Sequence, residues 1–334
     1  MAKTSAVVLL LAFTILVSGY AQTSPSGQPG PAAPTRRQSP PAAQDTGVKL
    51  AENGHCAEAM PLLKKAFARI TDKDQRKNIG VDLVRCSNEV NATDSALDAM
   101  RALTREFASD PDVLFLAVHV YSDLSIRASQ QLMVKAPTSY QVHLLNAEAL
   151  ETQGKWDEAK LEYQAILESN PNLPGIHYRV GRLFLSAPKT PTTMDDAHSE
   201  FEQELKINPD NAGAEYVLGE MARQAEQWPD AIAHFSQAVK LDPKFTDAQM
   251  GLGRAMLAAE RPGDAVPPLE QAVKLQPDNP ATHFHLATAY RRAGRKADAD
   301  REFLAHKLAT EKAHQSADEL RKALSSGPAE KASQ

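Results

Sequence analysis

The stretch that decides the fold is KINPDNAGAEYVLGEMARQAEQWPDAIAHFSQAVKLDP, residues 206–243, which begins and ends in similar tetrapeptides. KINP closes on Pro209 and KLDP closes on Pro243, and each proline follows apolar residues at helical spacing. Because proline disfavours the helical conformation of the residue before it, each tetrapeptide should end a helix. The stretch therefore predicts one helical unit that runs from the first proline to the second.

The same proline recurs through the chain at a nearly constant spacing, which only one interval exceeds. Its positions are Pro137, Pro171, Pro209, Pro243 and Pro277, and the longer interval is the one that ends at Pro209. Self-similarity at a fixed period of about 20–50 residues indicates an array of stacked units. Such an array buries the apolar face of each unit against its neighbour and offers a long surface for binding.

Two further recurring positions explain how the helices of a unit pack. The first helix carries a small residue, at Gly181, Gly219 and Gly253, and the second helix carries a bulky one, such as Phe201 or Phe235. Small residues let two helices approach closely, and the bulky side chain fills the remaining space, since protein interiors are close-packed. Strand-like alternation of useful length is missing from the sequence. The sequence therefore predicts an all-α fold.

These positions resemble the tetratricopeptide repeat, in which a large residue, Leu-Gly, an aromatic residue, Ala, Phe, Ala and Pro follow one another at fixed offsets. Five units in residues 138–311 match this pattern well, and residues 45–137 match it as divergent units. The resemblance implies a right-handed superhelical solenoid of antiparallel helix pairs, continuous from about residue 45 to 324.

Two irregular points are expected in this solenoid. The unit between Pro111 and Pro137 is shorter than the others, so its inter-helix turn should be cut down near Ser122–Asp123. In another unit, four extra residues lengthen the turn at Ser186–Asp196, where two prolines exclude helix and predict an exposed loop.

The amino-terminal residues predict export. Residues 1–21 combine Lys3, an apolar run and a small-x-small site at Gly19–Ala21, which is the pattern of a secretory signal peptide. Cleavage after Ala21 is the expected outcome, and an uncleaved membrane tether is the alternative. Contact with the membrane would then be transient, and the protein would resemble exported bacterial members of the family, located in the periplasm or cell envelope.

The regions that flank the repeats have their own signatures. Residues 22–44 are rich in Pro, Gln and Ser and predict a disordered linker, because they bury little apolar surface. Ser316 and Glu319 resemble a capping box, which predicts a short capping helix over residues 312–324. Residues 325–334 are expected to form a disordered tail.

Composition and motifs argue against several function classes. The net charge of −5, from 37 basic and 42 acidic residues, disfavours nucleic acid as a partner. The sequence lacks a glycine-rich phosphate loop and a G-x-S-x-G elbow, so no enzyme activity and no cofactor are expected. His143, His177 and His283 share one repeat position, which packing explains, and His283 and His285 point to different sides of a helix. We therefore expect no metal site.

Cys56 and Cys86 are the only cysteines. Export makes a disulfide possible, and the repeat register places the two residues on neighbouring helices. Buried free cysteines are the alternative, and the sequence leaves both open.

The resemblance also implies a ligand groove, since the family's concave wall is lined by fixed positions of each first helix. Its candidate residues are aromatic residues, methionine, arginines and one glutamate, types that include those enriched at interfaces. They are Glu148, Tyr178, Arg182, Tyr216, Arg223, Met250, Arg254, Phe284, Arg291 and Arg292. A solvated helix face without a ligand is the alternative for these positions.

Function follows from this groove as an expectation. The chain is predicted to be a non-enzymatic scaffold that binds a protein or peptide through its concave face in the cell envelope. An acidic segment of that partner should direct its carboxylates toward Arg291 and Arg292, away from Glu148 and Glu151. The alternative is a structural or assembly factor that acts through its convex surface and edges, and a carbohydrate-binding role is a third, weaker option.

Overall fold

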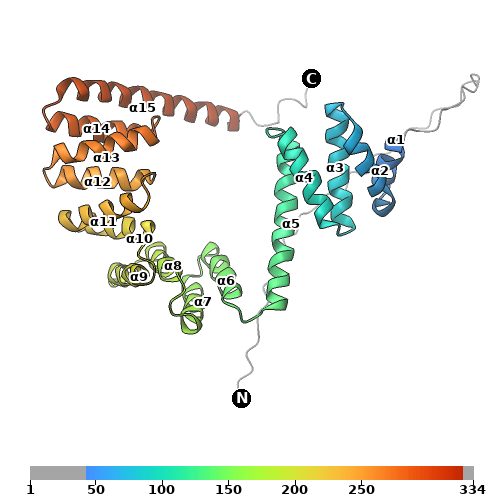
Figure 1. Cartoon of the computed structure of the whole chain (residues 1–334), viewed down its shortest axis with the longest axis horizontal. Coiled ribbons are helices and arrows are strands. Elements are labelled where there is room, and N and C mark those ends of the chain that lie inside the picture. The colour runs from blue at the N-terminus through green and yellow to red at the C-terminus, as the bar shows by residue number, and fades with distance from the viewer. Residues whose placement is uncertain (1–42, 326–334) are drawn as a thin grey trace, which may run out of the picture. The chain divides into compact units, whose positions relative to one another are not determined.

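A computed structural model describes residues 43–325, in which fifteen α-helices and no strand are present (Figure 1). Along the chain they are α1 (Ala43–Glu52), α2 (Cys56–Arg69), α3 (Lys73–Glu89), α4 (Thr93–Glu106), α5 (Pro111–Lys135), α6 (Tyr140–Thr152), α7 (Trp156–Ser169), α8 (Ile176–Ser186), α9 (Thr193–Ile207), α10 (Ala212–Gln224), α11 (Trp228–Leu241), α12 (Thr246–Ala258), α13 (Pro262–Leu275), α14 (Pro280–Arg292) and α15 (Lys296–Ser325). The all-α prediction is confirmed for these residues. The signal peptide, the linker up to residue 42 and the tail from residue 326 lie outside them.

The described residues divide into two compact units, residues 43–121 and 122–325, with the boundary inside α5. The first unit packs α1 on α2, α2 on α3 and α3 on α4. The second unit pairs α6 with α7, α8 with α9, α10 with α11, α12 with α13 and α14 with α15. In both units most contacts join helices that are neighbours in the sequence, and the others join first helices of adjacent pairs, as expected for stacked helix pairs.

The predicted turn near Ser122–Asp123 is wrong, because α5 is one uninterrupted helix of 25 residues. Asp110 starts this helix by accepting hydrogen bonds from the backbone N–H groups of Asp112 and Val113, at 3.0 and 3.2 Å. From Asp112 to Lys135 the sequence has no glycine or proline to end it. The short unit therefore forms a single helix, and instead of one continuous stack the structure has two units.

The close approach of paired helices in the second unit depends on glycine. A Cβ atom added at Gly181 would lie 2.8 Å from Phe201, and one added at Gly219 would lie 2.8 Å from Phe235. Both phenylalanine side chains are fully buried. Phe235 also contacts Gly251 of the next first helix, where an added Cβ would lie 2.7 Å away. The predicted packing of a bulky residue against a small one is thus present.

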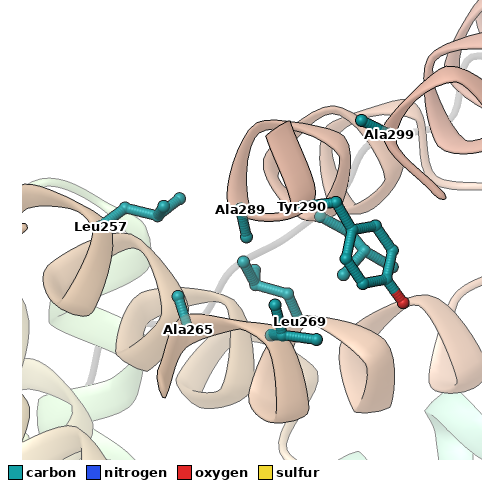
Figure 2. Packing of buried hydrophobic residues seen from close by; sticks show 8 residues of the cluster. Leu257, Ala265, Leu269, Ala289, Tyr290 and Ala299 are labelled. Carbon is teal, nitrogen blue, oxygen red and sulfur yellow. The ribbon is translucent and has the colours of Figure 1, made fainter. Parts of the chain in front are cut away.

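The same type of core continues to the end of the stack. Figure 2 shows Ala265 and Leu269 of α13 packed near Ala289 and Tyr290 of α14. The Tyr290 hydroxyl group lies at the edge of this cluster and donates a hydrogen bond of 2.5 Å to Oε1 of Glu270. Apolar burial and one polar contact at the rim therefore hold α13 and α14 together.

The lengthened turn between α8 and α9 is present as a mostly exposed segment, residues 187–192. The second helix begins earlier than expected, at Thr193, whose Oγ1 accepts a 2.7 Å hydrogen bond from the backbone N–H of Thr190. Asp195 and Asp196 lie in the first turn of α9, where negative charge stabilises a helix.

The predicted capping helix at 312–324 is wrong as a separate element. Helix α15 runs without interruption from Lys296 to Ser325, and Figure 1 shows it as a single long ribbon. Ser316 lies in its interior and cannot act as an N-cap there. No glycine or proline occurs in this range to break the helix. The side chains of Leu320 and Leu324 are 61% and 76% exposed, so this end does not cover the core.

The turns inside the helix pairs share a feature that the sequence did not reveal. In every pair of the second unit except α8–α9, one residue of the turn adopts positive φ, at Gly154 (71°), Glu226 (57°), Glu260 (57°) and Gly294 (81°). Successive members of this series recur with the period of the prolines, except across the unit with the long turn. Left-handed backbone is easy for glycine and costly for glutamate, so the fold imposes this conformation on Glu226 and Glu260.

Candidate functional site

The candidate site lies on the second unit, on the side formed by the first helix of each helix pair. Helix α10 contacts α12, and α12 contacts α14, so the first helices of three successive pairs lie next to one another. We call the side formed by α6, α8, α10, α12 and α14 the first-helix face. All ten residues predicted to line a groove lie on these helices.

In α6 and α8, the predicted residues are largely engaged with one another and with the core. Glu148 accepts a 2.8 Å hydrogen bond from Nη1 of Arg179, and Tyr178 packs edge-on against Phe201 with ring centroids 5.6 Å apart. Glu151 accepts a 2.6 Å hydrogen bond from the Tyr163 hydroxyl. Burial, and then the Glu151 carboxylate, raise the pKa of Tyr163. Among the predicted residues here, Arg182 is exposed and has no ion pair with any described residue.

In α10, α12 and α14, three arginines converge on one pocket. Arg223, Arg254 and Arg292 line a cavity of about 300 Å³. The remaining lining residues are Trp228, Leu257, Ala258, His285 and Thr288. The lining contains no aspartate or glutamate. Of the sequence-predicted residues, the structure therefore brings these three arginines together.

The three arginines differ in how their guanidinium groups are satisfied. Arg223 donates from Nε and Nη2 to Oε2 of Glu220, at 3.0 and 2.8 Å. Arg292 donates from Nη1 to the backbone carbonyl of Leu257, at 3.0 Å, near the carboxyl end of α12. Arg254 is half-buried and makes no hydrogen bond or ion pair with any described residue. Arg254 is therefore the arginine with the most unused donors.

The predicted role of Arg291 is not supported by its position. Its guanidinium carbon lies 5.0 Å from the ring centroid of Phe303, on α15, and Arg291 does not line the pocket. Consecutive residues of a helix differ by about 100° in direction, so Arg291 and Arg292 face different surroundings. Phe284 is 44% exposed and lies near Phe303 and His306. Phe284 and Arg291 therefore form a separate exposed cluster with α15.

Tyr216 of α10 and Met250 of α12 lie on the same helices as the arginines. Tyr216 packs against Phe235 and Phe245, with ring centroids 5.8 and 4.9 Å apart. Burial, and then the charges of Glu220 and Asp247, raise the pKa of Tyr216. Met250 is half-buried against the core beneath α12. Tyr216 and Met250 thus present partly apolar surface close to the arginines.

His285 belongs to the pocket although the sequence did not select it. Burial first, and the nearby charge of Arg254 second, lower the pKa of His285. The imidazole is therefore neutral at neutral pH and offers one donor and one acceptor.

Trp228 was also missed. It is the first residue of α11, a second helix, and the groove register counts only first helices. Its repeat equivalent is Trp156, the first residue of α7. The recurrence of tryptophan at this position was the available signal.

The recurring histidines have a structural explanation in hydrogen bonds between paired helices. Nδ1 of His143, His177 and His283 on first helices lies 2.6 Å from Oε2 of Glu162, Glu200 and Glu302 on the following second helices. The pair α10–α11 has the same contact with exchanged residues, Glu215 on the first helix and His234 on the second, at 2.7 Å. Within residues 43–325, no cluster of three or more His, Cys, Asp or Glu side chains is suited to a metal ion.

Cys56 of α2 and Cys86 of α3 are joined in the structure, with 2.12 Å between the sulfur atoms. Both side chains are buried in the first unit. None of the helices in the described part of the chain is long and apolar enough to cross a membrane.

Comparison with known families identifies repeats in the second unit. Three overlapping stretches, residues 194–245, 222–280 and 250–306, match the family described as tetratricopeptide repeat. These stretches contain α10 to α14, the helices that supply the arginine pocket. No curated protein matches the sequence.

Several solved structures are similar to part of the chain. A crystal structure of MamA protein shares 19% identity over 53% of this chain and 94% of its own, with a TM-score of 0.46. MamA residues 41-end from Desulfovibrio magneticus RS-1 shares 20% identity over 52% of this chain and 96% of its own, with a TM-score of 0.46. YrrB, described as a TPR protein with an unusual peptide-binding site, shares 16% identity over 55% of this chain and 92% of its own, with a TM-score of 0.46.

Proposed function

This chain is a tetratricopeptide repeat protein, and we propose that it acts as a non-enzymatic scaffold that binds a protein or peptide partner through the first-helix face of residues 138–311. We place this activity in the cell envelope, following the signal peptide pattern of residues 1–21.

The observation that carries the proposal is the lining of the face at α10, α12 and α14. Arg223, Arg254 and Arg292 meet there without an acidic lining residue, and Tyr216 and Met250 lie on the same helices. Arginine, aromatic residues and methionine are enriched at protein interfaces. An arrangement of unpaired positive charge beside apolar surface supports an extended or helical peptide with an acidic segment as the occupant.

The direction of such a peptide follows from the charges. The glutamates of the α6 end are already engaged, Glu148 by Arg179 and Glu151 by Tyr163. At the α12–α14 end Arg254 has no carboxylate, so the acidic segment should lie there. This placement replaces the one centred on Arg291, because Arg291 lies against Phe303.

The test is capture of partners from an envelope fraction by the full chain at low salt. The test variant carries both Arg254→Glu and Arg292→Glu. The matched control carries both Lys307→Glu and Arg321→Glu, at two exposed residues of α15. Both variants change the charge equally. We expect the wild type and the control to capture a partner that the test variant does not capture. Binding of this partner to the wild type should weaken as salt is added, because exposed charges are screened over about 8–10 Å.

The same experiment evaluates the alternative function. A structural or assembly factor that acts through its convex surface and edges would keep its partner in the Arg254 and Arg292 variant. If the α15 control loses the partner and the pocket variant keeps it, the first-helix face is not the binding surface. Fractionation of cells that produce the full chain tests the proposed location, which a cytoplasmic distribution would contradict.

A further inference from the structure

The arginine pocket differs from the rest of the first-helix face in its excess of positive charge. It is lined by Arg223, Arg254 and Arg292, three permanent cations, and by no acidic side chain. Glu220 neutralises Arg223 through two hydrogen bonds to one carboxylate oxygen. Two positive charges, those of Arg254 and Arg292, are left without an ion pair among the described residues.

Two of the three arginines that line the cavity are held in place by the fold. Arg292 is anchored by its bond to the Leu257 carbonyl, and Arg223 is anchored by Glu220. Each arginine comes from a different helix, and the three helices lie side by side. Because anchored side chains lose little conformational entropy on binding, Arg223 and Arg292 are in place before a ligand arrives, and Arg254 keeps its donors free for the ligand.

The remaining polar lining residues carry no negative charge at neutral pH. They are His285 and Thr288 of α14, and the Thr288 hydroxyl donates a 2.8 Å hydrogen bond to the backbone carbonyl of Phe284. Trp228, Leu257 and Ala258 form an apolar wall on the other sides. An anion in this cavity would be partly shielded from water, where charge-assisted hydrogen bonds are stronger than on an open surface.

We propose that this pocket is a binding site for a doubly charged oxyanion of the partner, supplied either by a phosphoryl group or by two adjacent carboxylates. The assignment rests on the proposed function, because it places the anion within a peptide bound to the first-helix face. Two charges are required because a single carboxylate would leave one of the two uncompensated arginines without a counter-ion. Oxygen is required because the guanidinium fork matches carboxylate and phosphate geometry.

The chain contains its own reporter for this site. Its two tryptophans are Trp156 and Trp228, and only Trp228 lines the pocket. Trp156→Phe in the full chain leaves Trp228 as the single indole, and Trp228→Phe leaves Trp156 as a matched control. The titrants are inorganic phosphate, succinate and acetate at constant ionic strength, with chloride as the balancing ion.

For the Trp156→Phe protein we expect saturable changes in Trp228 fluorescence with phosphate or succinate, and binding of acetate at least about tenfold weaker. Phosphate responding alone identifies a phosphoryl site, and succinate responding alone identifies a dicarboxylate site. Adding Arg254→Gln should weaken the responding anion at least about tenfold, and adding Arg321→Gln on α15 should leave it unchanged. The Trp228→Phe protein should not respond.

The assignment is overturned if neither dianion gives a saturable response, if acetate binds as well as both, or if Arg254→Gln has no effect. Circular dichroism of each variant establishes that the stack is intact. Capture of the envelope partner by the Arg254→Gln variant separates the two proposals. If no dianion binds the Trp156→Phe protein and the Arg254→Gln variant still captures the partner at full strength, the anion site is contradicted and the proposed scaffold function is not.

Discussion

Residues 43–121 and residues 122–325 share one packing contact between paired helices and differ in what is added to it. The second unit repeats one packing solution, a glycine on a first helix against a bulky residue on the second, at Gly181, Gly219 and Gly253. The first unit has two such contacts, at Gly47, which lies against Leu62, and at Gly80, which lies against Leu103 and Phe67. It adds a covalent link between α2 and α3.

Polar contacts also join the helices of the first unit. Arg76 of α3 lies over the Phe67 ring of α2, 4.4 Å from its centroid, and forms a 2.8 Å ion pair with Glu106 of α4. Lys77 forms a 2.9 Å ion pair with Asp110, whose pKa is lowered by the hydrogen bond from Lys77. The comparison teaches that a close-packed glycine contact holds helix pairs together in both units, and that the divergent repeats add a covalent link between neighbouring pairs.

The largest effect is expected from removing a bulky residue of the second unit. Phe235→Ala should lower the free energy of unfolding by about 3–5 kcal/mol, because the fully buried ring contacts two helices and would leave a cavity. Chemical denaturation followed by tryptophan fluorescence measures this, since both tryptophans lie in the second unit. Hydrogen exchange in α2 and α3 should stay unchanged, and equal loss of protection there would show that the units are not independent in stability.

Removing the disulfide should affect the other unit. Cys56→Ser with Cys86→Ser should lower the stability of residues 43–121 by about 3–4 kcal/mol, because the bridge closes a loop over a sequence separation of 30 residues. Hydrogen exchange in α2 and α3 measures the loss, with α10 to α13 as the internal control. Thiol labelling of the denatured, unreduced exported protein checks the premise, since two reactive thiols would show that no bridge forms.

A smaller effect is expected from closing the gap at one glycine. Gly219→Ala should destabilise the second unit by about 1–3 kcal/mol, because the added Cβ would lie 2.8 Å from the Phe235 ring. Gly263→Ala is the matched control, since a Cβ there meets no atom within 4 Å. If both substitutions have the same effect on the denaturation midpoint, close packing at Gly219 does not stabilise the repeat.

The smallest effect concerns the turns. Glu260→Gly should stabilise the second unit by up to about 1 kcal/mol, because glycine adopts the left-handed conformation without the cost that glutamate bears. Asn91 has the same φ of 57° in a turn of the first unit, and Asn91→Gly should change stability less, because asparagine tolerates this conformation. Thermal denaturation of the two variants compares them, and a larger gain at Asn91 would contradict the explanation.

The fold was predictable where local signals repeat. The prolines, the glycines and the bulky residues opposite them defined the helix pairs of residues 138–311, because each constraint acts within one unit. Prediction failed at α5 and α15, where the expected boundaries had no residue that ends a helix. At both places a helix boundary was expected by analogy with the other repeats. The chain instead continues as one helix, because no glycine or proline interrupts it.

The sequence indicated the helices of the candidate pocket and only some of its residues. The repeat register selected Arg223, Arg254 and Arg292, because that register fixes the direction of each first-helix side chain. It also selected Arg291, whose contact with Phe303 it could not show, since Phe303 lies on α15, a second helix. Trp228 was missed for the same reason, since a pocket between helix pairs takes side chains from both helices of a pair.

The exchanged contact between Glu215 and His234 limits how this array can have grown by duplication or recombination. A crossover that joined α10 to the second helix of another pair would place Glu215 against Glu162, Glu200 or Glu302, two carboxylates at hydrogen-bonding distance. The reciprocal product would place His234 against a histidine of α6, α8 or α14. Breakpoints are therefore favoured between pairs and disfavoured within them, so the inheritable module is the intact pair α10–α11.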